Sequence, residues 1–225
     1  MADLLKPTSE EDICNLVLDL LKQSPIASIH TPVTSTEFIF ARWYTTVRQA
    51  ALRSHPWKFA TKRSLLTPNL STTPPFGYTY AYDIPSDFIR MITIGDDYLG
   101  DLKTERVLEN GQILTPSGSN ANMDPDNPTT LYLRYVYDCI EVGKFDALFV
   151  SYFTTRFALR LVSKFAISAA LKKELQEDYL DISSEARAVN GQDAPIKRIQ
   201  NSKLLTKRRG LPGGIYASKY TTFDS

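Results

Sequence analysis

The stretch FDALFVSYFTTRFALRLVSKFAI at residues 145–167 decides the fold. Its apolar character allows a membrane anchor, the central helix of a globular core, or a surface that packs against copies of itself. Three basic residues, Arg156, Arg160 and Lys164, interrupt it. Each would cost about 2.5–3.5 kcal/mol at a bilayer centre, more than the apolar side chains regain together. We reject the anchor and predict a core helix from Asp146 to about residue 169.

The three basic residues are spaced by four, so they form one narrow row on the predicted helix, which we name the basic stripe. The other faces are apolar or aromatic and must be covered. The next predicted helix, residues 170–191, carries an acidic stripe: Glu174, Glu177, Asp178, Asp181 and Glu185. Two interpretations stay open: the stripes form salt bridges between antiparallel neighbours, or the basic stripe faces a solvent channel or another subunit.

The N-terminal region predicts two further helices. Its signals are two capping-box spacings, Thr8 with Glu11 and Thr34 with Glu37. With the apolar period that follows each of them, they predict helices over about 9–23 and 34–54. For the second helix we expect a buried face made of Ile39, Trp43, Val47, Ala50 and Ala51.

From Trp57 onward the apolar period changes from about 3.6 residues to 2, which predicts five or six short strands. The pair Asn110-Gly111 stands between two apolar runs, and this is the strongest hairpin signal in the chain. Residues 115–130 consist of polar turn formers and predict a long exposed loop.

These elements predict an α+β fold with a C-terminal extension. We expect the helix pairs of residues 1–56 and 143–191 to build one helical bundle, because they bracket the β region. The β region, residues 57–142, is then a mainly antiparallel insertion, and residues 192–225 form an extended basic arm.

The arm differs from the rest of the chain in charge. It holds seven Lys and Arg residues against two aspartates, a net charge of +5, so residues 1–191 carry −4 of the total of +1. It has too few apolar residues to build a core of its own. Bulky anchors are nevertheless present at Ile215, Tyr216 and Tyr220. We therefore expect an arm that folds on a partner and not a purely disordered tail.

The histidines and paired aspartates do not predict a catalytic or metal site. His30 and His55 are the only histidines, and neither has a partner at metal-ligand spacing. The carboxylate pairs Asp96-Asp97 and Asp124 with Asp126 lack the further ligands of a calcium loop and are interpreted as turn formers. We expect no catalytic residue, no metal and no cofactor.

The two cysteines, Cys14 and Cys139, are too few for a disulfide framework and are expected to be reduced core residues. The N-terminal sequence MADLLKPTSEED shows no signal-peptide pattern, so an intracellular location is expected.

Three blocks carry a resemblance to a known family. They are RQAALRSHPWKFATKRSLL at 48–66, YAYDIPSDFIRM at 80–91, and LYLRYVYD followed by the two C-terminal helices at 131–189. In this order they resemble the head-to-tail adaptor of short-tailed bacteriophages, the tail tubular protein A or gatekeeper type. The chain departs from the family pattern in the loop at 115–130 and in the arm.

The resemblance implies a non-enzymatic α+β subunit of the virion. Such subunits form a dodecameric ring between the portal protein and the tail nozzle protein, around the channel through which genomic DNA leaves without sequence-specific binding. We expect the arm to engage the portal through Lys203, Lys207, Arg208, Arg209, Ile215, Tyr216 and Tyr220. The alternative from a different class is a nucleic-acid-binding protein whose basic arm follows phosphates.

Overall fold

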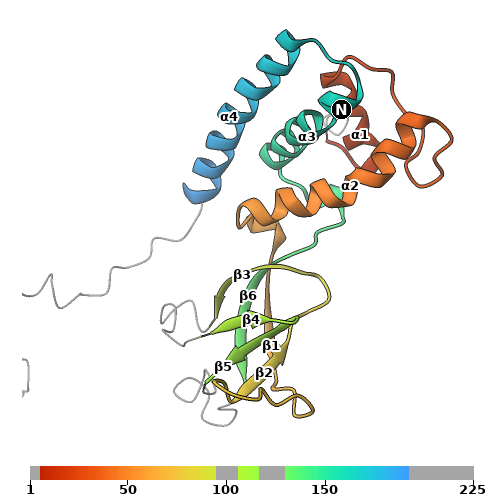
Figure 1. Ribbon diagram of the computed structural model, residues 1–225. Helices are drawn as coiled ribbons and strands as arrows, with labels where there is room; N and C mark the ends of the chain where they lie inside the picture. The colour runs from red at the N-terminus through yellow and green to blue at the C-terminus, as the bar shows by residue number, and fades with distance from the viewer. Residues whose placement is uncertain (1–5, 95–105, 117–129, 193–225) are drawn as a thin grey trace, which may run out of the picture. The chain divides into compact units, whose positions relative to one another are not determined.

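The computed structural model describes residues 6–94, 106–116 and 130–192, with side chains as far as Val189. The chain divides into two units, residues 1–191 and 192–225, and the fold described below is that of the first. It is mixed α+β: the described residues form four α-helices and two antiparallel three-stranded sheets (Figure 1). The α+β class expected from the sequence is therefore confirmed.

Helix α1 (Glu10–Leu20) begins one residue later than its predicted cap implies. The capping box consists of Ser9 and Asp12, and the predicted pair of Thr8 and Glu11 was wrong. Glu11 instead accepts a hydrogen bond from the backbone N–H of Ile29, at 3.3 Å. Its carboxylate therefore binds the loop before α2 and does not cap α1. The helix also ends earlier than predicted, and Lys22 follows it with a φ of 56°.

Helix α2 (Ser35–Ser54) has the predicted capping box of Thr34 and Glu37 and the predicted end. Its buried face differs from the prediction, because Ile39, Trp43 and Ala50 are only half-buried. The residues that face the core are Glu37, Phe40, Tyr44, Val47, Arg48, Ala51 and Leu52. Val47 and Ala51 are buried as predicted, but the charged Glu37 and Arg48 also face the core, so a count of apolar positions alone identifies the buried face only in part.

Helix α3 (Ala147–Leu161) begins at the N-cap Asp146, whose side chain accepts a hydrogen bond from the backbone N–H of Leu148 at 2.8 Å. The predicted continuation to residue 169 was wrong. A short 3₁₀ turn follows α3, and Ala166 has a φ of 48°, which separates α3 from helix α4 (Ala169–Gln192). Phe165 and Ile167 continue the apolar pattern across this break, so periodicity gave no sign of it.

The six strands form two sheets with the orders β1-β6-β3 and β2-β5-β4. Asn110 and Gly111 join β4 to β5 with φ values of 46° and 73°, the left-handed geometry of a two-residue hairpin, which confirms that prediction. Strand β6 lies between β1 and β3 and leads toward α3 (Figure 1). The strands are β1 (Thr61–Leu66), β2 (Tyr80–Asp83), β3 (Phe88–Ile94), β4 (Val107–Glu109), β5 (Gln112–Thr115) and β6 (Leu131–Tyr137).

Two hydrophobic cores support these elements. The larger core surrounds α3 and includes both cysteines, which are buried and free as predicted. The smaller core lies between the strands and contains Tyr82, Ile94, Ile113, Leu131, Leu133 and Tyr135. Tyr137, at the end of β6, packs against both cores and so joins the helical part to the sheets.

Candidate functional site

Helix α3 is held by a column of phenylalanines at a spacing of four residues. The ring centroids of Phe145 and Phe149 are 5.0 Å apart, those of Phe149 and Phe153 5.8 Å, and those of Phe153 and Phe157 6.0 Å. On α2, Phe40 and Tyr44 pack edge-on against the column. The helix is therefore a core element, and its few polar positions are the ones available for other contacts.

Arg156, the first residue of the basic stripe, belongs to a polar cluster formed by side chains of α2, α3 and α4. Its Nη1 donates to the Tyr152 hydroxyl at 2.8 Å. That hydroxyl lies 3.1 Å from Ser54 Oγ on α2 and 3.2 Å from the Tyr179 hydroxyl on α4. Burial favours the neutral Tyr152 phenol, but hydrogen bonds and the Arg156 charge outweigh it and lower the pKa of Tyr152. The cluster connects three helices through one phenol.

The other two members of the basic stripe lie elsewhere. The guanidinium of Arg160 stacks over the Trp43 ring of α2 at 4.4 Å from its centroid, a cation–π contact. Lys164 is exposed in the turn after α3. The structure therefore does not gather the stripe at one place, because α3 ends before its third member.

The acidic stripe lies on the outer surface of α4. Glu174, Asp178 and Asp181 are exposed, and none of them forms an ion pair within residues 6–94, 106–116 and 130–192. The pairing of the two stripes within one chain is thus not found in the described part. On α4 itself, Lys173 and Glu177 form an ion pair at 3.6 Å.

A second group of cations surrounds the C-terminal end of α2. Arg53 Nη1 donates to the carbonyl of Ile89 at 2.6 Å, and Arg90 Nη1 donates back to the carbonyl of Arg53 at 3.1 Å. His55 is the C-cap residue of α2. Burial lowers the pKa of its imidazole, and the nearby charges of Arg187 and Arg90 lower it further. Arg187 also acts on the Tyr179 phenol, together with Arg156. Four arginines from four elements, α2, β3, α3 and α4, therefore lie near one another.

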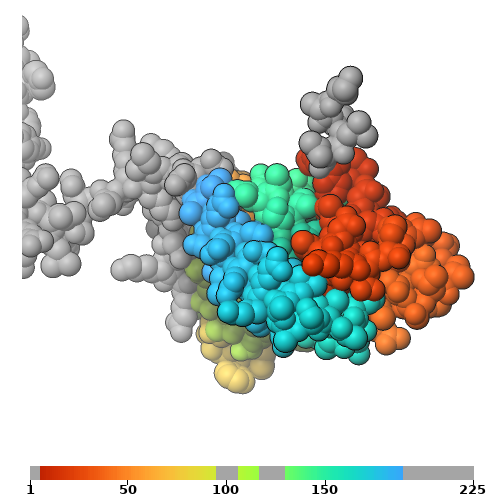
Figure 2. Space-filling view, turned by 90° about the horizontal axis from the view of Figure 1, so that it is seen from above, coloured from red at the N-terminus to blue at the C-terminus, as the bar shows by residue number. Residues whose placement is uncertain are grey.

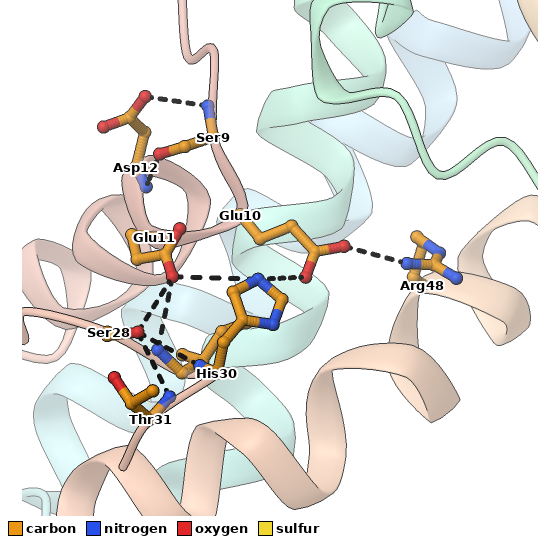
Figure 3. A network of polar contacts seen from close by, with 9 residues as sticks. Ser9, Glu10, Glu11, Asp12, Ser28, His30, Thr31 and Arg48 are labelled. Carbon is orange, nitrogen blue, oxygen red and sulfur yellow. Dashed lines mark hydrogen bonds and ion pairs between the residues drawn. The ribbon is translucent and has the colours of Figure 1, made fainter. Parts of the chain in front are cut away.

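A buried polar network centres on Arg48 of α2, and Figure 3 shows the contact of Arg48 with Glu10. Arg48 donates two hydrogen bonds to the Asp138 carboxylate, from Nε and Nη2, each 3.1 Å long. Its Nη1 donates to the Glu10 carboxylate, also at 3.1 Å. Gln49 adds a fourth bond, to Asp138 at 2.9 Å. The network ties the start of α1 to α2 and to the residue after β6.

The outer edge of this network is formed by His30, whose Nε2 lies 3.5 Å from Glu10 and 3.8 Å from Glu11. Figure 3 shows the Glu10 carboxylate between His30 and Arg48. Burial raises the pKa of Glu10, against the opposing effect of the Arg48 charge. The arrangement is a brace between elements that are distant in the sequence, and it binds the helical part to the β region.

Sequence reasoning missed both the Arg48 network and the arginine group around His55. One signal was present: Arg48 follows Tyr44 by four residues and precedes Leu52 by four, so it lies on a buried row of α2. A buried arginine requires a carboxylate, and Asp138 stands directly after a strand. The arginines around His55 come from separate elements, and no local spacing connects them.

The predicted portal-binding residues of the arm, Lys203 to Tyr220, lie outside the described residues, as do Asp96-Asp97 and Asp124 with Asp126. In the part of the chain that the structure does describe, no group of three or more His, Cys, Asp and Glu residues is arranged to hold a metal ion. Nor does any helix there combine the length and apolar character needed to cross a membrane.

Comparison with known proteins adds no relationship. No protein-family model matches this chain, and no curated protein sequence matches it.

Proposed function

We propose that this chain is a structural subunit of a ring that joins the portal vertex of a short-tailed bacteriophage to its tail nozzle. The ring, a dodecamer by resemblance, encloses the channel through which DNA leaves the virion. The subunit carries no enzymatic activity in this proposal, and DNA passes it without sequence-specific binding. Its location is the head-tail junction.

The observation that carries the proposal is the sequence block at 131–189, which has the strongest resemblance to the adaptor family. In the structure this block contains β6, α3 and α4 in succession, with a short 3₁₀ turn before and after α3. A strand that leads into a largely buried helix and then into a charged outer helix supports a subunit whose α4 is available for neighbours.

We further propose that the two helix pairs complete one bundle, with the β region inserted between them. The contacts of α1 and α2 with α3 support this arrangement. Phe40 and Tyr44 of α2 pack on Phe157 and Phe153 of α3. The Arg48 network then fixes the inserted β region to the bundle at Asp138. Such bracing suits a subunit that must keep its shape between two partners.

The arm is proposed to be the portal-binding element. Its net charge of +5 would attract an acidic portal surface, and Tyr216 and Tyr220 would anchor the docked segment. The test compares two full-length variants in binding to the cognate portal protein. Arg208→Ser/Arg209→Ser removes two charges from the arm, while the control Lys22→Ser/Arg42→Ser removes two exposed charges from the helical part.

We expect the arm variant to lose portal binding at moderate salt, and the control to bind as wild type does. Both should give the far-UV circular dichroism of the unaltered protein, since Lys22 and Arg42 are exposed and the arm has too few apolar residues to build a core of its own. Equal binding by all three proteins would refute the assignment of the arm.

The second candidate function, nucleic-acid binding, is favoured by one observation: arginines gather around His55 in addition to the basic arm. A salt-dependent affinity for duplex DNA with a slope of several ions would support it. The negative charge of residues 1–191 argues against a broad DNA surface.

A further inference from the structure

Helix α4 carries opposite charges on its two flanks. Glu174, Asp178, Asp181 and Glu185 follow one another at steps of four, three and four residues, so they form one row, the acidic flank. Val189, four residues after Glu185 and 40% exposed, extends this row with an apolar side chain. Figure 2 shows that α4, coloured cyan to blue, lies at the surface along its length.

Arg187 lies on the other side of the same helix. It follows Glu185 by two residues, which at 3.6 residues per turn places it about 160° away from that carboxylate. Leu180, seven residues before Arg187 and 65% exposed, shares its face. The charges of Arg187 and Arg90 both act on His55, and those of Arg187 and Arg156 both act on Tyr179. Arg90 also donates a hydrogen bond to the carbonyl of Arg53. We name these four arginines the basic flank.

Neither flank is neutralised within the described part of the chain. The four carboxylates and the four arginines form no ion pair there, although Arg53, Arg90 and Arg156 do donate hydrogen bonds to uncharged oxygens. Each flank thus combines four like charges with one exposed apolar side chain. The two flanks are therefore opposite in charge and similar in composition.

We propose that the acidic flank of one copy packs against the basic flank of the next copy, head to tail. This inference rests on the proposed ring function and names the contact that closes the ring. Because the flanks lie on opposite sides of one helix, the contact leaves one copy with a free basic flank and the other with a free acidic flank, and each can bind a further copy. A head-to-tail contact of this type does not stop at a dimer, and it forms a closed ring when the rotation between successive copies closes.

A second copy fits the basic flank better than DNA does. Leu180 shares the face of Arg187 and offers DNA phosphates no hydrogen bond, whereas Val189 on the acidic flank is an apolar partner for it. Charge complementarity fixes which surface meets which, and like flanks repel each other.

The test uses two full-length charge-reversal variants. Arg90→Glu/Arg187→Glu makes the basic flank acidic, and Asp181→Lys/Glu185→Lys makes the acidic flank basic. Their masses are measured by sedimentation velocity without portal, at about 20 mM salt, where the Debye length exceeds 10 Å and charge contacts are strongest. The wild type should form species larger than a dimer that dissociate as salt increases.

Each variant alone should associate at least about tenfold more weakly than wild type, since like charges then face each other. An equimolar mixture of the two should recover the large species, because the reversed flanks attract each other and the unaltered flanks still match. Arg187→Glu alone, one exposed residue, repeats the test should the double variant fail to fold.

Three results would overturn the inference. They are a wild type that stays monomeric under these conditions, variants that associate as wild type does, and a mixture that stays as dissociated as its components. It is also overturned when Arg90→Glu/Arg187→Glu loses affinity for duplex DNA but keeps its self-association. Portal binding, assayed separately, distinguishes failure of this contact from failure of the proposed function.

Discussion

Replacing Arg48 by methionine removes the guanidinium that contacts both Asp138 and Glu10, while the apolar part of the side chain is kept. The exposed side-chain fractions are 6% for Arg48, 18% for Asp138 and 22% for Glu10. Removing one partner of a buried ion pair costs about 3–5 kcal/mol, because the other charge stays buried. Water reaches part of both carboxylates here, so the expected loss is at the lower end, about 3 kcal/mol.

Urea unfolding followed by circular dichroism measures this loss, with the slope of the transition unchanged. A decrease of the melting temperature by about 6–12 °C should accompany it. Arg42→Met is the matched control, since Arg42 is an exposed arginine of the same helix and should change stability by less than about 0.5 kcal/mol.

The double variant Arg48→Met/Asp138→Asn separates the ion pair from simple packing. Removing the unpaired charge should restore part of the loss, so that the double variant is about 1–2 kcal/mol more stable than the sum of the single changes predicts. An Arg48→Met protein as stable as wild type would show that the network contributes no stability, and strict additivity in the double variant would show that Arg48 and Asp138 are not energetically coupled.

Two further predictions concern local backbone contacts. The backbone N–H groups of Thr34 and Val33 lower the pKa of Glu37 to about 2, from an ordinary 4.5. The ionised carboxylate therefore stabilises the fold above pH 4.5, and this contribution is lost as pH falls toward 2. Glu37→Gln should therefore flatten the acid side of the stability curve, and an unchanged acid midpoint would contradict this. Gly111→Ala should destabilise the protein by about 1–2 kcal/mol, because Gly111 has a φ of 73° with open space around it, so only backbone strain is added. Gly143→Ala, also in open space but without positive φ, should cost less in the same urea titration, and equal costs would refute the assignment to strain.

Contacts between sequence neighbours were determined by the sequence itself. The capping box of Thr34 and Glu37 and the hairpin at Asn110-Gly111 are formed by residues no more than three positions apart. Their geometry is fixed by side-chain chemistry and by which residues tolerate positive φ. The α+β class followed in the same way, from a change of apolar period that each segment carries within itself.

The tertiary structure alone decided how distant charges meet. Arg48 and Asp138 are 90 residues apart, and Tyr152 and Ser54 are 98 apart, so no spacing rule connects them. The same packing turned Phe40 and Tyr44 of α2 inward and ended α3 before Lys164. A buried charge is stable only where another element places an oppositely charged side chain beside it, and this placement depends on how all the elements pack together.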